Sequence, residues 1–554
     1  MSNLEFDVVV VGSGAGGGFA AMALAETGLR VLVLERGQRY VPERDFPMNH
    51  MDWELRPDPL RQSATEPSLS IKVGEPVQPG FEHLCSGTAT RKAACATRTS
   101  FHYQRAVGLG GSTLHYQGEA HRFATYAIRS ASEYGLGVDW PIDYDELTSY
   151  YEQAEAILGV AGEPGNPFKP PRGPFPTAAH TLSKASQYVA QGAAELGWSL
   201  LPNTLALPSR SVDGRPPCQH SGGCVQGCKF GAKSSVDLTA LARAERTGNV
   251  TIVTGAKAVR LEVDRHRSIT AVVYLQRDER KQASGRAYVL AGGAIETPRL
   301  LLASTSPAFP RGAGNEHDQV GRYLMATLLV SMTVQFDVRL DPYKGPPIDA
   351  RIWDFARPKP GDRVRSGFVL GVSGTASGYH GPVSYALRTR GIGLAHKKAM
   401  RERFGTIVQL FAIAEQEPMA ENRLMLSKHA DKAGVPYGRI QFSYSQADRY
   451  VLETMFARCR QWADACGAMK ILGIRSSVDQ PGGAHVVGTC RMGRSPQSSV
   501  VDPYGQVHEV NNLYIADASV LPTQGAGDSP SLTIQALALR TARHLGERLV
   551  NKSV

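Results

Sequence analysis

The stretch that decides the fold is FDVVVVGSGAGGGFAAMALAETGLRVLVLER, which occupies residues 6–36. Its β-branched run Val8–Val11 predicts a buried parallel strand, and the Ala- and Leu-rich segment 15–27 predicts a helix that Gly28 ends. A second strand is expected at Val31–Leu34. Because a strand, a glycine-rich turn, a helix and a second strand follow one another at the usual offsets, the stretch predicts a dinucleotide-binding unit.

Three glycines in this stretch, Gly12, Gly14 and Gly17, have the spacing G-x-G-x-x-G. The first permits the tight turn, the second lets the backbone approach a pyrophosphate, and the third lets the helix pack closely on the strand. Glu35 ends the second strand, where a carboxylate can accept hydrogen bonds from a ribose, and Arg36 follows it. The motif does not distinguish NAD from FAD, because a phosphate at a helix N-terminus serves both.

Length and charge narrow the class of protein. A chain of 554 residues is expected to form two or more domains. The formal net charge is +10, but no basic run with interleaved aromatic residues favours nucleic-acid binding. The positive charge can instead serve an acidic redox partner or an anionic surface, or simply belong to a solvated protein surface. We expect no membrane span. The first strand begins by Phe6, so we expect no signal peptide and synthesis in the cytoplasm, with a cytoplasmic location or export to the periplasm by a partner subunit.

Three of the eight cysteines, Cys218, Cys224 and Cys228, fall in the segment CQHSGGCVQGC. Thiolates separated by glycines can wrap one compact metal centre, with backbone amides donating to sulfur. The absence of a fourth cysteine favours an iron–sulfur cluster with one corner lacking a thiolate. A zinc site with His220 as the fourth ligand competes with it, and the spacing also leaves open that no metal binds.

Further glycine-rich segments are expected near the cofactor. In RAVGLGGSTLHYQG, residues 105–118, Gly110 and Gly111 permit close backbone approach to a ligand, and Ser112 follows them. His115 is expected either to lie near the cofactor or to be a satisfied structural histidine. The strands of Val250–Val263, which include Ala258, and the strand, glycine pair and helix of Ala287–Ser304 indicate a return to the dinucleotide-binding domain.

The middle and the end of the chain have different patterns. From Arg322 to about Asp479, alternating segments such as Leu328–Phe336 and Ile440–Tyr444 predict an antiparallel sheet in a substrate domain. A short strand is then expected to end near Asp517, and Pro530–Leu539 is expected to be a helix that Asp528 caps. The N-terminus of that helix could stabilise negative charge on a flavin ring.

These patterns divide the chain into two expected units. Residues 1–165, 215–320 and 480–554 are expected to form the dinucleotide-binding domain, which includes the cysteine segment. Residues 166–214 and 321–479 are expected to form a lid or linker and the substrate-binding domain.

The chain resembles the glucose–methanol–choline (GMC) oxidoreductases, a family of FAD-linked alcohol dehydrogenases and oxidases. The resemblance rests on G-x-G-x-x-G from Gly12, GLGGST from Gly108, AGGAIETPRLL from Ala291, VGRYLM from Val320, HVVGTCRMG from His485, ADASVLPT from Ala516 and PSLTIQALA from Pro530. It implies an α/β fold in which a Rossmann-like FAD-binding domain carries an inserted substrate domain built on an antiparallel sheet. It also implies the cofactor FAD, with binding residues Gly12, Gly14, Gly17, Glu35, Arg36, Gly110, Gly111, Ser112, His115, Ala258, Asp517, Pro530 and Thr533.

Within the family, the chain is most similar to the flavoprotein subunit of bacterial three-component dehydrogenases for glucose, gluconate and related sugars. Those flavoproteins carry a three-iron, four-sulfur cluster on cysteines spaced C-x5-C-x3-C, which Cys218, Cys224 and Cys228 reproduce. The resemblance therefore implies a 3Fe–4S cluster here. It also implies a small companion subunit that carries the export signal and a cytochrome that receives the electrons.

The family's catalytic pair is a histidine and a second His or Asn beside the flavin. His485 matches the first position, and the second, directly before Pro530, is Ser529, which departs from the pattern. A second departure follows Met325, where relatives often have Asp-His-Pro and this chain has Ala-Thr-Leu. His115 matches the position where some relatives attach flavin covalently. We expect His485 to act as the base and Ser529 to orient the hydroxyl of an alcohol or sugar. The alternatives are an alcohol oxidase that uses oxygen and a non-catalytic flavin-binding scaffold with a zinc knuckle.

Overall fold

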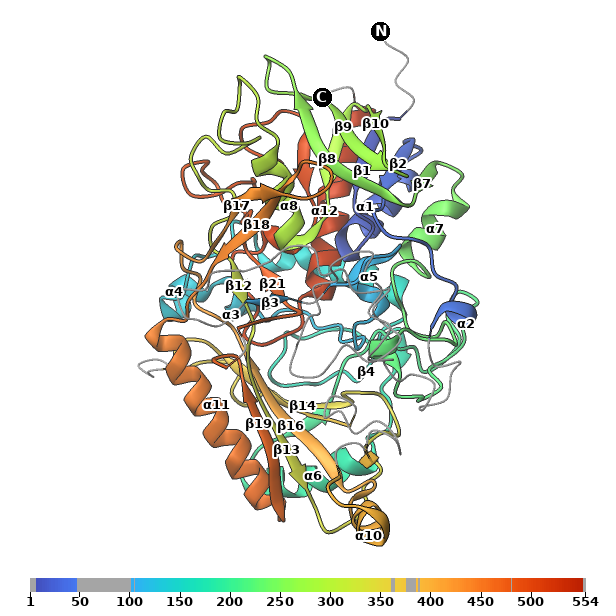
Figure 1. The fold of residues 1–554 in the computed structure, drawn as a ribbon, viewed down its shortest axis with the longest axis vertical. Helices are drawn as coiled ribbons and strands as arrows, with labels where there is room; N and C mark the ends of the chain where they lie inside the picture. The colour runs from blue at the N-terminus through green and yellow to red at the C-terminus, as the bar shows by residue number, and fades with distance from the viewer. Residues whose placement is uncertain are drawn as a thin grey trace.

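The computed structural model describes residues 6–46, 101–103, 105–359, 364–374, 385–386, 389–479 and 481–551. A five-stranded parallel sheet forms the centre of the upper half of the molecule as drawn in Figure 1. Its strands, in spatial order, are β22 (Leu513–Ile515), β11 (Ala287–Leu290), β1 (Val8–Val11), β2 (Val31–Leu34) and β7 (Val250–Val253). Three distant parts of the chain therefore meet in one sheet.

The centre of this sheet is apolar on both faces. Strands β1 and β2 read VVVV and VLVL and are almost wholly buried, as expected for a covered parallel sheet. Helix α1 (Ala15–Glu26) packs against α12 (Ser531–Val550) and α7 (Ala240–Arg246). The approach of α1 requires glycine, because a Cβ on Gly16 would stand 1.7 Å from the carbonyl oxygen of Ala516.

A six-stranded antiparallel sheet forms the lower half of the molecule (Figure 1). Its strands, in spatial order, are β19 (Lys470–Ser476), β13 (Leu328–Gln335), β16 (Ile407–Ala414), β15 (Phe368–Ser373), β14 (Ala350–Ile352) and β6 (Leu200–Pro202). Helix α11 (Gln446–Ala465) packs on β13 and β16, and α6 (Lys184–Glu195) packs on α11. These elements share a second hydrophobic core.

Smaller sheets and helices complete the described structure. A three-stranded antiparallel sheet contains β8 (Ala256–Val263), β9 (Ile269–Gln276) and β10 (Glu279–Ala283). The strand pairs are β3 (His102–Tyr103) with β20 (Gly482–Gly483), β4 (Ala161–Gly162) with β5 (Thr177–Ala178), β12 (Met325–Ala326) with β21 (Val486–Val487), and β17 (Arg423–Ala430) with β18 (Pro436–Gln441). The remaining helices are α2 (Pro42–Asp45), α3 (Thr125–Ile128), α4 (Ser130–Tyr134), α5 (Tyr144–Leu158), α8 (Gly293–Ala303), α10 (Gly393–Arg403), and the 3-10 turns η2 (Gly111–Leu114), η3 (Cys224–Gln226) and η4 (Ala518–Val520).

The expected fold class is confirmed, with a parallel sheet and a separate antiparallel sheet. The first two strands have the expected bounds, and the first helix ends at Glu26. Two local expectations are wrong. The strand near 440–444 is β18, which forms a hairpin outside the six-stranded sheet. Asp528 does not cap the last helix, whose N-cap is Pro530 and receives no side-chain hydrogen bond.

The domain division is a prediction that these sheets illustrate but do not test. Strand β6, from the segment expected to be a lid, joins the six-stranded sheet. Strand β5, from the same segment, pairs instead with β4, on the other side of the expected boundary at residue 165. Within the described ranges, no helix has the length and apolarity needed to cross a bilayer.

Alanine at Gly16 is expected to destabilise the protein, because its Cβ overlaps the Ala516 carbonyl and the helix or the facing loop must shift. The expected loss in the free energy of unfolding is about 1–3 kcal/mol. Gly14→Ala is the matched control, since the nearest atom to its Cβ would be the Cα of Gly111, 3.9 Å away. Urea unfolding of both variants without added cofactor measures the difference. Equal free energies of unfolding would contradict this packing argument.

Candidate functional site

A cavity lies at the carboxyl ends of β1, β2, β11 and β22, the usual ligand position in an open parallel sheet. Nine of the expected cofactor-binding residues line it: Gly12, Gly14, Glu35, Arg36, Gly111, Ser112, Ala258, Asp517 and Pro530. The expected base His485 lines it too. The backbone at Gly14 is open to the cavity, because an added Cβ there would meet nothing closer than 3.9 Å. A pyrophosphate can therefore approach the amides at the start of α1.

Two buried carboxyl groups shape the cavity wall. Glu35 accepts hydrogen bonds from the hydroxyl of Ser13 at 2.5 Å and from the backbone N–H of Gly37 at 2.7 Å. Burial raises its pKa, and these donors oppose the rise. Asp517 accepts from the hydroxyl of Thr297 at 2.6 Å and from the N–H of Gly293 at 2.9 Å. The two carboxyl groups thus fix the turns that follow β2 and β11.

Sequence reasoning missed a group of charged residues on the same wall. Arg105 and Arg299 pair with Glu296 at 2.8 and 3.1 Å. Arg36 lies close enough for the charges of Arg105 and Glu296 to affect its pKa. Burial disfavours the charge of Glu296, but the two arginines outweigh it and lower its pKa to about 2. Arg299 also pairs with Asp431 at 2.9 Å, so carboxylates hold the arginines in place on this wall, and arginine is a residue type that binds phosphate groups well. Glu296 and Arg299 are three residues apart on α8, but no spacing rule connects them with Arg36 and Arg105.

Four expected cofactor contacts do not line the cavity. Gly17 packs behind the turn, where its Cβ would stand 2.0 Å from the carbonyl oxygen of Gly12. Gly110 has φ of +101°, which glycine adopts without strain. Thr533 shares a hydrogen bond of 2.8 Å with the hydroxyl of Tyr151. The Nε2 atom of His115 is buried and has no hydrogen-bond partner among the described residues. Their part in cofactor binding stays a prediction.

His485 lies between β20 and β21, with its side chain partly exposed to the cavity. Its backbone carbonyl accepts from the side-chain amide of Gln524 at 3.1 Å, which holds this segment in place. Burial, against the opposing effect of Glu119 and with smaller contributions from Arg351 and His121, lowers the pKa of the imidazole to about 4. The imidazole is therefore neutral at neutral pH, the state that a proton acceptor requires.

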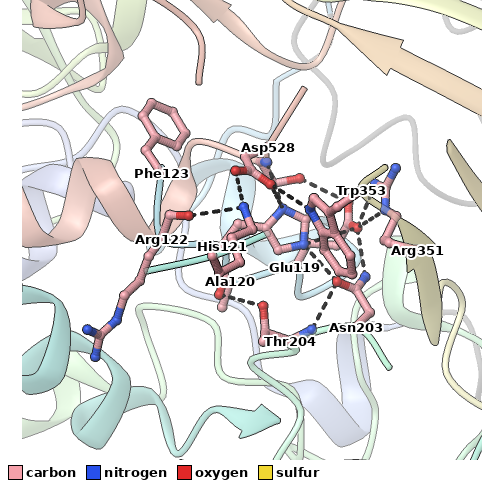
Figure 2. Close-up of polar contacts among 12 residues, drawn as sticks. Glu119, Ala120, His121, Arg122, Phe123, Asn203, Thr204, Arg351, Trp353 and Asp528 are labelled. Atoms are coloured by element: carbon pink, nitrogen blue, oxygen red, sulfur yellow. Dashed lines mark hydrogen bonds and ion pairs between the residues drawn. The ribbon is translucent and has the colours of Figure 1, made fainter. Parts of the chain in front are cut away.

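Glu119 is the centre of a buried polar network that the sequence did not predict (Figure 2). It accepts two hydrogen bonds on one oxygen and one on the other from Arg351, at 2.6–2.8 Å, and one from Asn203 at 2.8 Å. The hydroxyl of Ser529 donates to it at 2.9 Å. Burial disfavours its charge, but Arg351 and then His121 outweigh that effect and lower its pKa to about 2. Glu119 is therefore ionised at neutral pH.

The tautomer of His121 follows from its neighbours. The N–H of Thr204 donates to the side-chain oxygen of Asn203 at 2.9 Å, and the amide nitrogen of Asn203 donates to Glu119. The Asn203 oxygen is thus an acceptor, so Nε2 of His121, 2.7 Å away, carries the proton. Nδ1 then accepts from the backbone N–H of Ser529 at 3.0 Å. His121 is therefore neutral, and it holds the backbone of Ser529 through this hydrogen bond.

The loop before α12 presents Asp528 and Ser529. Residues 525–527 have φ values of +81°, +55° and +89°, and a Cβ at Gly527 would stand 2.3 Å from the carbonyl oxygen of Ile413. Buried Glu415 accepts the N–H groups of Gln524 and Ala526 and so holds the loop. Burial raises the pKa of Glu415 to about 7.

Asp528 is part of the network and does not serve as a helix cap. It pairs with Lys169. It also accepts from the indole of Trp353 at 3.2 Å (Figure 2). Ser529 is buried, and its hydroxyl is directed to Glu119 and not to the cavity lining. One signal was available in the sequence: GEAHRF, which carries Glu119 and His121, comes directly after the glycine-rich motif.

The cysteine segment lies close to the segment that lines the cavity. Cys224 is buried, and Cys218 and Cys228 are partly buried; all three are free thiols. Burial raises the pKa of Cys224 to about 12. Lys233, also buried, donates to the carbonyl oxygens of Cys224 and Leu114 at 2.6 and 2.7 Å. Burial lowers the pKa of Lys233 to about 8, against the opposing effect of the nearby thiols.

One group of ligand atoms in the described residues is close enough to hold a single metal ion. Nδ1 or Nε2 of His180 and His220 and the sulfur of Cys218 all lie within 4.8 Å of one another. Nε2 of His180 lies 2.7 Å from the carbonyl oxygen of Leu207, and its Nδ1 lies 3.1 Å from Nε2 of His220. Sequence reasoning named His220 but missed His180, which lies 38 residues before Cys218 in the chain (218 − 180).

Comparison with known proteins gives the family. Models of GMC oxidoreductase match residues 89–326 and 418–538, and a model of an FAD binding domain matches residues 7–41. The chain is 30% identical to 2-methyl-1,2-propanediol dehydrogenase of Mycolicibacterium austroafricanum, over 98% of this chain and 96% of that protein. It is 33% identical to 6'''-hydroxyparomomycin C oxidase of Streptomyces lividus, over 98% and 92%. It is 29% identical to the fructose dehydrogenase large subunit of Gluconobacter japonicus, over 98% of both.

A solved structure shows the same fold. Pyridoxine 4-oxidase from Mesorbium loti superimposes with a TM-score of 0.68 at 17% identity, over 98% of this chain and 99% of that one. Three observations indicate the same family: the cavity at the strand ends, the matched family models, and the relatives that align along the whole chain. The chain belongs to the glucose–methanol–choline oxidoreductase family and is an FAD-dependent oxidoreductase that acts on CH–OH groups.

Proposed function

We propose that the protein is a dehydrogenase for a sugar, a glycoside or another alcohol, and that its electrons leave through a 3Fe–4S cluster on Cys218, Cys224 and Cys228. The observation that carries the proposal is a pair of sites that Lys233 connects: a neutral His485 on the cofactor cavity, and three free thiols in the segment whose Cys224 carbonyl accepts from buried Lys233. Substrates named for relatives, such as fructose and 2-methyl-1,2-propanediol, support a polyhydroxy alcohol.

Bound FAD supplies the hydride acceptor. The residues of this chain do the rest. Backbone amides at the start of α1, from Gly14 on, would hold the pyrophosphate, and the arginines around Glu296 lie on the same cavity wall. Nε2 or Nδ1 of His485 takes the hydroxyl proton, because no described residue occupies the ring nitrogens with a hydrogen bond and the ring is neutral.

Ser529 has a different role from the one expected of it. A serine that donates its proton to Glu119 offers a substrate only lone pairs, so it cannot also donate to the substrate oxygen. We assign it to holding the loop before α12 against Glu119. Together with the backbone bond to His121, this fixes the N-terminus of α12 where Pro530 and Ile534 line the cavity.

The three thiols fit a cluster better than a single ion. The sulfurs of Cys218, Cys224 and Cys228 do not form a described group within 4.8 Å of one another, whereas one tetrahedral zinc would hold them about 3.8 Å apart, given Zn–S bonds of about 2.3 Å. In a cluster each thiolate binds a different iron, so wider spacing is required. The positive charge of Lys233 beside them suits an anionic centre.

A zinc site is the rival that one observation favours, since His180, Cys218 and His220 converge on one point. It would serve a non-catalytic scaffold with a zinc knuckle. An oxidase that transfers electrons to oxygen is the other rival, and relatives such as 6'''-hydroxyparomomycin C oxidase and paromamine 6'-oxidase are named oxidases. For the dehydrogenase we propose a small companion subunit, a cytochrome or similar one-electron acceptor, and a location in the cytoplasm or, after export with that subunit, the periplasm.

His485→Ala is expected to slow flavin reduction by the substrate about 10²–10⁴-fold, because the proton acceptor is lost, while FAD remains bound. In the wild type the rate should rise as pH rises through about 4, where His485 loses its proton, and then stay level to neutral pH. Anaerobic stopped-flow absorbance measures both. His544→Ala, a ring stacked on Tyr504 away from the cavity, is the control. A near-wild-type rate in His485→Ala would place the base elsewhere.

Ser529→Ala is expected to lower the same rate by about tenfold or less, since it removes one neutral hydrogen bond of about 0.5–1.5 kcal/mol. Glu119→Gln leaves Arg351 buried without its carboxylate and is expected to cost about 3–5 kcal/mol in the free energy of unfolding. Stopped-flow absorbance and urea unfolding separate the two effects. If Ser529→Ala were as slow as His485→Ala with normal stability, Ser529 would act directly on the substrate.

The purified protein is expected to contain iron and acid-labile sulfide in stoichiometric amounts. Cys224→Ser should lose them, keep FAD, still reduce the flavin with substrate, and lose most transfer to an external one-electron acceptor. Cys459→Ser is the control, since that buried cysteine lies on α11. Elemental analysis checks the prediction. Stoichiometric zinc without labile sulfide would contradict it and support the site at His180, Cys218 and His220.

A further inference from the structure

Lys233 connects the two sites that the proposed function requires. Its ammonium group donates to the carbonyl oxygens of Leu114, Tyr116 and Cys224, at 2.7, 3.2 and 2.6 Å. Leu114 ends the turn η2, whose first residues line the cofactor cavity, and Cys224 begins η3 in the cysteine segment. One side chain therefore ties the cavity wall to the cysteine segment.

The hydrogen-bond partners of Lys233 leave its charge uncompensated. The side chain is only 2% exposed, and all three acceptors described for it are neutral carbonyl groups. Asp237 is the nearby carboxyl group, but no hydrogen bond joins Lys233 to it in the described structure, and the ammonium nitrogen instead lies 5.4 Å from the centroid of the Tyr116 ring. A buried ammonium without an anion is costly. The site is thus built for negative charge at the cysteines.

We propose that Lys233 is a positioning residue that raises the reduction potential of the cluster on Cys218, Cys224 and Cys228. This inference rests on the proposed function, since it requires the cluster. Three thiolates make the centre anionic, and a fixed positive charge beside it stabilises the form that carries one more electron. Water cannot screen this charge, because Lys233 and Cys224 are both buried.

The electron count shows why the potential matters. Oxidation of one CH–OH group to a carbonyl releases two electrons and two protons, and a cytochrome takes one electron at a time. Two passages through the one-electron centre therefore complete each turnover. A higher potential at the centre favours removal of each electron from the cofactor cavity. The bonds from Lys233 to Leu114 and Cys224 also keep the distance between the two sites constant.

The test is a redox titration of the cluster, monitored by electron paramagnetic resonance, in anaerobically purified protein. Lys233→Met and Lys233→Gln remove the charge, and the Gln variant keeps a donor for the carbonyl groups. Both are expected to lower the equilibrium constant for cluster reduction at least tenfold, which is 59 mV toward lower potential for one electron. Lys233→Arg should stay near the wild type. Lys229→Met, a partly exposed lysine next to Cys228, is the matched control and should shift the potential much less.

Each outcome decides one claim. Unchanged potentials in the Met and Gln variants with full iron content would overturn the inference and leave Lys233 a purely structural residue, while the cluster itself stands. Loss of iron from both neutral variants but not from Lys233→Arg would support it, because charge is then what retains the centre. Loss of iron from all three would overturn it in favour of side-chain shape. Absence of iron and sulfide from the wild type would instead refute the proposed function.

Discussion

The buried ion pair of Glu119 and Arg351 is the interaction on which the active site depends. Glu119 follows the glycine-rich segment of the cofactor cavity, and Arg351 lies on β14 of the six-stranded sheet, so the pair joins the two halves of the molecule. A buried pair of this kind contributes little net stability, because both charges lose water. The pair instead positions other residues, because the carboxylate of Glu119 also accepts hydrogen bonds from the side chains of Asn203 and Ser529.

Through those contacts the pair fixes the start of α12, where Pro530 and Ile534 line the cofactor cavity. Asn203 sets the tautomer of His121, His121 accepts the backbone N–H of Ser529, and α12 begins two residues later. Glu119 and Arg351 also affect the pKa of His485, in opposite directions, so burial remains the main influence on it. The imidazole of His485 is therefore neutral without a carboxylate of its own, and a paired charge network surrounds it.

The sequence predicted what depends on local patterns and missed what depends on folding. Strands β1 and β2 and the turn between them follow from β-branched runs and glycine spacing, which act over a few residues. His485 was found because a motif of neighbouring residues marks it. The contacts of Glu119 with Asn203 and Arg351 could not be found in this way, since those partners lie 84 and 232 positions from Glu119 along the chain. The direction of the Ser529 hydroxyl depends on Glu119, so the contact that it makes could not be read from its position in the sequence.

The most direct test is to mix the wild-type protein anaerobically with a panel of sugars and smaller polyols, record flavin absorbance, and then add either oxygen or a one-electron acceptor. The account predicts that at least one polyol bleaches the flavin, that the cluster signal changes in the same sample, and that the one-electron acceptor restores the colour far faster than oxygen does. A protein whose flavin no alcohol bleaches, or whose colour oxygen restores at least as fast, would contradict the account.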